Sequence, residues 1–516
     1  MRTPRPILGA TALAAVLTLA GCASGGSGSS HGPDRGAGAS TAPATRPGED
    51  RRPAIASVLS TPAGNDPQVK VDLVGLNRLG SAHVVVQLRV TNPAAQDIDL
   101  GPRLQETNDG GPAGPDGIAL VDPAARRLLG PYRQAGGGGC LCSPKRDDSG
   151  WYARAGGSLS LFAVLPAPSG GAATTTVYTP LARPFVNVPI SAAAPVPPPG
   201  ERIPNPDGMR LETVSHPIDA RSESLDGAQE IHDDGGDVQV NLSADVLFQL
   251  NKADLTPRAE ALLKTAAQQI DASPGGTVKV EGHADSSGTD AINDPLSQKR
   301  ADTVKNRLTA LVTRTGVAYD AKGYGSSRPL WSNETDEGRR RNRRVTISFP
   351  RPQRPGTPQV PAGGTAAPAG QAGPVTAKDG EGKTTMRAEA LAVQPIGGDY
   401  GVLTYRVTNE GDARAEIPGL SRDDEWMKLR FIGAASASLV DPAARMRYPA
   451  ARFLLGTGFR SALCLCTGTA GIRLGADILA PHTAREFWSV VKLPPGATST
   501  SVDLGAFPRI AGVPIR

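Results

Sequence analysis

The sequence has no large excess of charge of either sign, so its composition alone does not indicate a polyanionic partner. Its 55 Lys and Arg residues nearly balance 50 Asp and Glu residues, and the pI of 8.9 is only mildly basic. The one basic run is "GRRRNRRV", at Gly338–Val345, and a run of this kind is compatible with nucleic-acid binding. The N-terminal features described next indicate export, and an exported chain rarely meets nucleic acid. We therefore expect no nucleic-acid partner.

The N-terminal apolar run is too short to cross a bilayer comfortably. It extends from about Ile7 to Ala20 behind two arginines, which is typical of a signal-peptide core. It ends in "LAGC", at Leu19–Cys22, which resembles the lipobox of bacterial lipoproteins. The resemblance implies that residues 1–21 are removed and that Cys22 is diacylated through its sulfur. An ordinary signal peptide followed by a chance Cys is the alternative.

A lipid-modified Cys22 would place the protein in the cell envelope. Two or more acyl chains give stable anchoring, since each buried methylene contributes ~0.8 kcal/mol. We therefore expect a protein that is lipid-anchored to the extracytoplasmic face of a membrane. The composition, rich in Ala, Gly, Pro and Arg, indicates a high-GC actinobacterial host. In such a host the lipid would lie in the outer leaflet of the plasma membrane.

Cysteine is scarce, and apart from Cys22 it occurs only in two Cys-Leu-Cys triplets, whose members are Cys140, Cys142, Cys464 and Cys466. Export permits disulfides, and four cysteines allow three pairings. A bond within one triplet requires a tight turn, because two residues on one face of a strand lie too far apart for an easy bridge. Metal binding by paired thiolates is the alternative. No His lies near either triplet to complete such a site, so we expect neither a metal nor a cofactor.

Segments rich in Pro, Gly and polar residues divide the chain. They have few apolar side chains to bury and are predicted to be a flexible tether and two linkers, at residues 22–64, 191–236 and 351–385. Between them lie three globular candidates, each large enough for its own core, at residues 65–190, 237–350 and 386–516.

The two outer globular segments share landmarks in the same order. "LVDPAAR" is identical at Leu120–Arg126 and Leu439–Arg445, "LRVTN" at Leu88–Asn92 matches "YRVTN" at Tyr405–Asn409, and both segments contain CLC and end on VPI. We interpret them as duplicated copies. Runs of β-branched residues between Pro and Gly predict β-sandwiches that resemble immunoglobulin-like modules of actinobacterial lipoproteins. Neither copy shows a convergent catalytic set, so we expect spacer or interaction modules.

The central segment, 237–350, has the alternation of predicted strands and helices that is typical of an α/β domain. "VQVNLSADVLF" predicts a strand, and "TPRAEALLKTAAQQID" predicts a helix that Thr256 caps and Pro257 begins. "GTVKVEGHAD" predicts a second strand, and a second helix is expected from Asp294, with Pro295 in its first turn. "VAYDAKGYG" and "RRVTISF" add two strands. The predicted order is β-α-β-α-β-β, one sheet under two helices.

Five motifs in this segment carry a family resemblance. They are "DVLFQLNKADLTP" (Asp245–Pro257), "VEGHADSSG" (Val280–Gly288), "NDPLSQKRA" (Asn293–Ala301), "GYGSSRP" (Gly323–Pro329) and "NETDEGRRRNRRV" (Asn333–Val345). In this order they closely resemble the OmpA-like C-terminal domain, over about a fifth of the chain. The family includes the periplasmic domain of the outer-membrane porin, the peptidoglycan-associated lipoprotein and the flagellar stator protein. The resemblance implies noncovalent binding of peptidoglycan through the diaminopimelate of its stem peptide.

The residues themselves suit that ligand. The side-chain end of diaminopimelate carries an ammonium and a carboxylate, so its site needs one anion, one cation and neutral groups to orient the zwitterion. Asp285 and Arg300 are expected at the surface, and the planar fork of Arg300 suits a carboxylate. The resemblance assigns Asp285 to the ammonium and Arg300 to the carboxylate, with four further residues lining the pocket: Asn251, Ser287, Asn293 and Arg343.

Two other interpretations of these residues stay open at this point. An Asp–Arg pair is commonly a surface salt bridge that contributes under ~1 kcal/mol. Glu281, His283 and Asp285 alternate along a strand and could mimic a metal triad. The remaining arginines of residues 339–344 are expected to pair with helix carboxylates. The segment also departs from the family, with Ala284 where Thr is common and Ile292 where an aromatic residue is common.

Together these features predict a noncatalytic lipoprotein that binds peptidoglycan and tethers the membrane to the cell wall. One alternative is an adhesion or complex-assembly protein that works mainly through its β-domains. Another is a cell-wall hydrolase or hydrolase activator, which would need a carboxylate pair, a zinc set or a Cys-His nucleophile. None of these sets stands out in the sequence.

Overall fold

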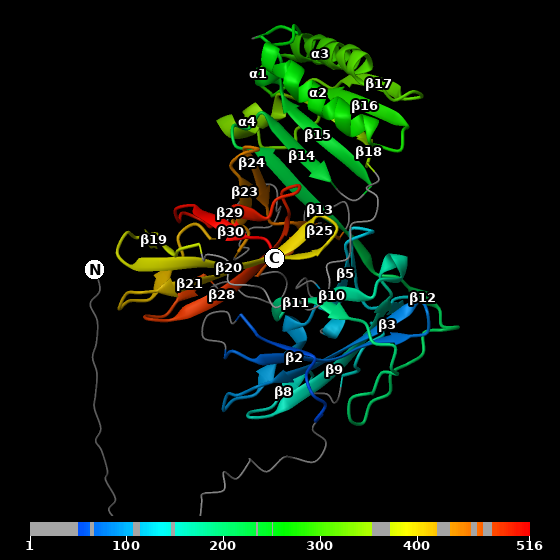
Figure 1. The fold of residues 1–516 in the computed structure, drawn as a ribbon, viewed down its shortest axis with the longest axis vertical. Helices are drawn as coiled ribbons and strands as arrows, with labels where there is room; N and C mark the ends of the chain where they lie inside the picture. The colour runs from blue at the N-terminus through cyan, green and yellow to red at the C-terminus, as the bar shows by residue number, and fades with distance from the viewer. Residues whose placement is uncertain are drawn as a thin grey trace, which may run out of the picture. The chain divides into compact units, whose positions relative to one another are not determined.

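A computed structural model describes most of the chain after residue 49. The described ranges are 50–61, 67–106, 114–145, 150–233, 236–249, 251–352, 372–420, 434–455, 462–467 and 477–516. Figure 1 shows a chain that is mostly β-strand, with its labelled α-helices gathered in the central segment. The predicted signal peptide, the lipidation residue Cys22 and most of the predicted tether lie outside the described residues.

The central domain is an α/β sandwich whose elements follow the predicted order, with two short helices, α1 and α4, added. The elements are β15 (Asp237–Ser243), α1 (Ala244–Leu247), α2 (Pro257–Asp271), β16 (Thr277–Gly282), α3 (Asp290–Leu311), β17 (Ala318–Gly323), α4 (Asp336–Asn342) and β18 (Arg344–Pro350). The sheet order is β14-β15-β18-β16-β17, in which only β16 and β17 run parallel. Apolar side chains of α2, α3 and one face of the sheet form a single core.

The two long helices begin differently. Thr256 caps α2 as predicted, because its side-chain oxygen accepts the Ala259 N–H at 3.1 Å and Pro257 takes the first helical position. The predicted start of the second helix at Asp294 is wrong, since α3 begins at Asp290. The Thr289 carbonyl accepts N–H groups of the first turn. Pro295 therefore lies inside the helix and not in its first turn.

Each outer segment contains a four-stranded antiparallel sheet. The first is β1 (Ala56–Leu59), β2 (Lys70–Leu79), β3 (His83–Thr91) and β9 (Ser158–Pro166), and the second is β19 (Val375–Lys378), β20 (Thr385–Gly397), β21 (Tyr400–Asn409) and β28 (Ala484–Lys492). The pairing order is the same in both, and β2 and β20 each carry a bulge where they pair with the next strand.

A second set of strand pairings also recurs. In the first segment β5 (Ala119–Asp122) pairs with β6 (Arg127–Leu129) and β10 (Thr174–Thr179), which pairs with β11 (Ala182–Pro189). In the second, β23 (Ser438–Asp441) pairs with β24 (Met446–Pro449) and β29 (Ser499–Asp503), which pairs with β30 (Ile510–Pro514). The remaining short strands are β4 (Ile98–Asp99), β7 (Arg133–Gln134), β8 (Tyr152–Ala153), β22 (Ala415–Glu416), β25 (Arg452–Leu454), β26 (Ala462–Cys464) and β27 (Ile478–Leu479).

The segment predicted as a linker at 191–236 contains β12 (Leu211–Glu212), β13 (Ser215–Ser224) and β14 (Gln229–Asp233). Strand β13 pairs with β6 of the first outer segment, with β24 and β25 of the second, and with β14, which extends the central sheet. The linker prediction is wrong here. Strands from three parts of the chain pair with β13 and form the hydrogen bonds that its backbone N–H and C=O groups need. Predicted linkers also overlap β1 and β19.

Each Cys-Leu-Cys triplet forms its own disulfide, Cys140–Cys142 and Cys464–Cys466. The Cα atoms are 5.3 Å and 5.2 Å apart, which is closer than the ~6.6 Å between alternate residues of an extended strand. This contraction supplies the tight local geometry that a bond within a triplet requires. Leu141 and Leu465, between the cysteines, are buried.

Candidate ligand-binding site

Asp285 lies in the loop between β16 and α3, and the loop folds around its carboxylate. The Ser287 N–H donates to Asp285 Oδ1 at 2.9 Å. The side-chain amide of Asn293, at the start of α3, donates to the carbonyls of Asp285 and Gly288, each at 3.2 Å. Of these residues Ser287 is exposed and Asn293 is buried. The loop therefore presents Asp285 in one fixed position.

Arg343, which follows α4, bridges Asp285 to a second carboxylate. Its Nη1 donates to Asp285 Oδ2 at 2.5 Å, while Nε and Nη2 donate to the two oxygens of Asp245 in α1, at 2.9 Å and 2.8 Å. Burial acts to raise the pKa of Asp285, but the Ser287 N–H and the Arg343 guanidinium outweigh it and lower the pKa below its usual value. The hydrogen bond to Asp245 raises the pKa of Arg343. The Asp285 carboxylate is thus ionised at neutral pH.

Arg300, on α3, supplies the second cation. Its Nε donates to the Lys252 carbonyl at 3.1 Å, and its guanidinium carbon lies 5.1 Å from the centre of the Phe248 ring. Burial lowers the pKa of Arg300, Asp245 counteracts this, and Arg343 adds to the lowering. Its two terminal nitrogens have no hydrogen-bond partner among the described residues. They can therefore form a bidentate contact with an incoming carboxylate.

The structure brings Asp285, Arg343 and Asp245 into direct contact and places Arg300 within electrostatic reach of Asp245 and Arg343. No ion pair joins Asp285 to Arg300 within the described residues, so the salt-bridge alternative is wrong for this pair, and Asp285 pairs with Arg343 instead. Two carboxylates and two guanidiniums leave the site with no net charge. That balance suits a zwitterion, whose ammonium and carboxylate can each face an opposite charge.

The expectation that Asp285 and Arg300 lie at the surface is wrong. Asp285 is 6% exposed and Arg300 is 8% exposed. Arg343 and the following loop cover Asp285, and Arg300 packs over Phe248. Asn251 and Ile292 are exposed, and Asn251 has a left-handed backbone with φ of 56°. The charged pair is therefore held in place by its surroundings before any ligand arrives.

Sequence reasoning missed Asp245 and Phe248 as site residues. Both lie in the motif "DVLF" that begins the family resemblance, but nothing in its spacing indicates a contact with Arg343 or Arg300. The expectation for the other arginines is confirmed for Arg339, Arg340 and Arg341, which pair with Asp336 or Glu337 on α4. It is wrong for Arg344, whose terminal nitrogens contact only backbone carbonyls. The arginine run is thus largely neutralised within the domain.

His283 does not share a metal site with its neighbours. It is 3% exposed and its ring stacks on Tyr324, with ring centres 5.6 Å apart. Burial lowers the pKa of His283 to about 3, and the nearby charges of Arg344 and Arg328 add to the effect. Glu281 lies 3.6 Å from Arg328. Across the described ranges, no three His, Cys, Asp or Glu side chains are grouped to hold a metal ion.

Comparison with known proteins places the central domain in a family. Residues 247–343 match the OmpA family, so the resemblance inferred from the five motifs is confirmed. The segment is 41% identical over 106 residues to outer membrane porin F of Pseudomonas aeruginosa, covering 20% of this chain and 30% of the porin. It is 39% identical over 105 residues to the peptidoglycan-binding protein ArfA of Mycobacterium tuberculosis, covering 20% and 31% of the two chains.

Solved structures match between a fifth and a quarter of the chain. The cell wall anchor of the T6SS from Pseudomonas aeruginosa is 30% identical, with 24% of this chain and 88% of that chain covered and a TM-score of 0.22. The peptidoglycan-associated lipoprotein from Burkholderia pseudomallei is 27% identical, with 20% and 86% covered and a TM-score of 0.18. The chain spans about a third of the length of the porin and of ArfA. No helix in the described part of the chain is long and apolar enough to cross a membrane.

Proposed function

We propose that the central domain binds peptidoglycan without catalysis, through the diaminopimelate of the stem peptide, and that the protein tethers a membrane to the cell wall. The observation that carries this proposal is the neutral cluster of two carboxylates and two guanidiniums, in which Arg300 keeps two nitrogens without partners among the described residues. The name of the mycobacterial relative, a peptidoglycan-binding protein, supports it.

The charges define a binding mode. The ligand carboxylate binds the free nitrogens of Arg300, and the ligand ammonium binds Asp285. Arg343 holds Asp245 through two nitrogens, so it can yield its single contact with Asp285 and stay in place. The exposed Asn251 and Ser287 then orient the zwitterion from the rim, while the buried Asn293 holds the loop that carries Asp285. The Ala284 and Ile292 departures from the family remove no charge from this arrangement.

Comparing sacculi with two types of stem peptide tests this binding mode. Lysine-type stem peptides lack the side-chain carboxylate that Arg300 is proposed to bind. The purified protein should therefore sediment with diaminopimelate-type sacculi and bind lysine-type sacculi at least tenfold more weakly, since the lost contact is worth more than ~1.4 kcal/mol. Equal binding to both walls would exclude diaminopimelate as the recognised group. Unchanged glycan and peptide mass profiles after incubation would support the absence of hydrolysis.

The membrane end of the tether is proposed to be the acylated Cys22, which lies outside the described residues. Cys22→Ala should move the protein from the membrane fraction to the soluble fraction of the host envelope, because each buried methylene contributes ~0.8 kcal/mol to retention. Detergent-phase partitioning of wild type and variant measures this. Ser30→Ala, in the same predicted tether, is the control, since it leaves the Cys22 thiol and both disulfides intact. A Cys22→Ala protein that still partitions with detergent would rule out the lipid anchor.

The outer segments are proposed to be duplicated immunoglobulin-like modules that act as spacers or interaction surfaces. The recurrence of strand pairings, of the disulfide and of the "LVDPAAR" turn supports this. Their shared contact with β13 favours a joint role, in which both modules fix the position of the wall-binding domain. In this arrangement any protein partner would meet the modules together.

A further inference from the structure

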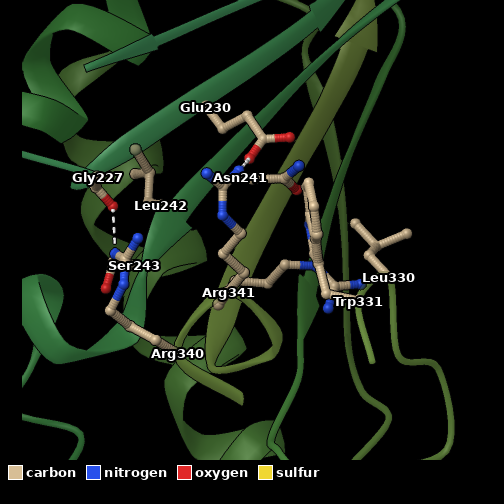
Figure 2. Close-up of a pocket in the computed structure, with 10 residues that line it drawn as sticks. Gly227, Glu230, Asn241, Leu242, Ser243, Leu330, Trp331, Arg340 and Arg341 are labelled. Atoms are coloured by element: carbon tan, nitrogen blue, oxygen red, sulfur yellow. Dashed lines mark hydrogen bonds and ion pairs between the residues drawn. The ribbon is translucent and has the colours of Figure 1, made fainter. Parts of the chain in front are cut away.

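A small pocket of the central domain is lined by residues of β14, β15, β18 and α4, and Figure 2 shows the side chains that line it. Side chains alternate along β15 and β18, so that Leu242 and Val345 enter the core with the helices. Ser243 and Arg344, their neighbours in sequence, point to the opposite face and line the pocket. Trp331 and Leu330, from the segment before α4, form an apolar wall.

Two buried donors in this pocket lack partners. Ser243 is 8% exposed and Arg344 is 5% exposed, and neither Ser243 Oγ nor Arg344 Nε has a hydrogen-bond partner among the described residues. Leaving a buried donor unsatisfied is unfavourable, and more so for a charged group. Because both donors line one cavity, the described protein groups leave two hydrogen bonds unformed there.

Arg344 also lacks a carboxylate partner. Its terminal nitrogens contact only the carbonyls of Asn342 and Arg328, at 3.4 Å and 3.2 Å, and no carboxylate lies within 4.0 Å among the described residues. Burial lowers the pKa of Arg344 to about 10, with Glu230 and Glu281 opposing the shift. The guanidinium therefore stays charged at neutral pH while nothing neutralises it at close range.

The other arginines of the pocket are already paired. Arg341 lies 2.9 Å from Glu230, and its guanidinium carbon lies 4.3 Å from the centre of the Trp331 ring (Figure 2). Arg340 pairs with Glu337 at 2.7 Å and donates to the Gly227 carbonyl at 3.1 Å. Among the described residues that line the pocket, Arg344 is the cation without an acidic partner.

We propose that this pocket binds a small carboxylate carried on a short apolar group. The carboxylate would accept hydrogen bonds from Arg344 Nε and Ser243 Oγ, and the apolar group would lie against Trp331 and Leu330. Glu230, Ser243 and Arg344 lie outside residues 247–343, the range that matches the OmpA family. The pocket shares no residue with the Asp285 cluster, so the proposal does not depend on wall binding. A free aliphatic acid and the carboxyl terminus of a short peptide both have this chemistry.

Fluorine NMR of the whole chain tests the proposal. The chain has 4 Trp residues, so 5-fluorotryptophan labelling gives few signals, and Trp331→Phe identifies the one from the pocket. Titration with propionate should shift the Trp331 signal saturably, whereas propionamide, which has the same shape without charge, should not. Titration with N-acetyl-D-alanine separates the peptide source from the free acid, and saturable binding of either acid supports the proposal.

Substitution at the pocket provides the second readout. Ser243→Ala should weaken the affinity for the bound acid about tenfold, because a hydrogen bond to a charged group is worth at least ~1.4 kcal/mol. Lys264→Gln, which removes an exposed charge from α2, should leave the affinity unchanged. The proposal fails if neither acid gives a saturable shift in the folded protein, which would mean that water alone fills the pocket. It also fails if propionamide binds equally well or if Ser243→Ala has no effect.

Discussion

Asp285→Asn and Arg300→Lys should each abolish detectable sedimentation of the protein with diaminopimelate-type sacculi. Either change leaves one charge of the ligand desolvated and without its partner, at a cost of about 2–5 kcal/mol. This corresponds to a loss of affinity of roughly thirtyfold to several thousandfold. Arg300→Lys keeps the positive charge, so its failure would show that the planar fork is needed.

These conservative variants are preferable to alanine because both residues are buried. Asn at position 285 can still accept the Ser287 N–H, and Arg343 keeps its two hydrogen bonds to Asp245. Asp320→Asn and Arg314→Lys are matched controls, since both residues are exposed in the same domain. Circular-dichroism melts should show that all four variants fold. Folded Asp285→Asn and Arg300→Lys proteins that sediment like wild type would place the binding site elsewhere.

The sequence predicts the central domain well because its signals are local. Thr256 and Pro257 mark the start of α2, and alternating apolar residues mark β15, β16 and β18. The motifs also identify Asp285, Ser287, Asn293 and Arg343. In the structure, hydrogen bonds join Ser287 and Asn293 to Asp285, and Arg343 contacts the Asp285 carboxylate. Spacing along the chain cannot show that Arg343 reaches Asp245, since these residues meet only after α1 and α4 pack.

Composition misled the sequence analysis at 191–236. Polar residues of β13 such as Asp219, Arg221 and Glu223 are typical of a solvated linker, yet all three are buried. The two carboxylates pair with arginines far away in sequence, Asp219 with Arg452 at 2.6 Å and Glu223 with Arg341 at 3.3 Å. Ile218 and Ala220 on the same strand join an apolar cluster with residues of both outer segments. A partner in another segment is not visible in the local pattern.

The duplicated motif "LVDPAAR" shows how far identical sequences can diverge in role. Arg126 and Arg445, its last residues, share a left-handed backbone with φ of 53° and 55°. Their carbonyls accept N–H groups from β13 and the residue after it, Ile218 at 2.9 Å and Leu225 at 2.8 Å. Their side chains differ, since Arg126 is 2% exposed and Arg445 is exposed.

Arg126 lies at the centre of a buried ionic network that joins three parts of the chain. It pairs with Asp399 of the second outer segment at 2.7 Å and with Asp233 at the end of β14. Its guanidinium carbon lies 5.3 Å from the centre of the Tyr400 ring. Lys492 and Arg351 are the next cations. Lys492 lies 3.6 Å from Asp233 and 3.8 Å from Asp399, and Arg351 lies 3.8 Å from Asp233. Without Arg126 the two carboxylates would be buried with a more distant counter-charge.

Arg126→Met should therefore lower the free energy of unfolding by about 3–5 kcal/mol, the usual cost of removing one partner from a buried ion pair. Arg445→Met changes the same residue type at the same backbone conformation but in solvent, and should cost less than ~0.5 kcal/mol. Urea unfolding of both variants, followed by tryptophan fluorescence at neutral pH, measures the difference. Adding Asp399→Asn to Arg126→Met should recover part of the loss, because Lys492 and Arg351 then have one buried carboxylate to offset instead of two. Equal losses for Arg126→Met and Arg445→Met would show that this network does not stabilise the junction of the three segments, and that backbone pairing along β13 is sufficient.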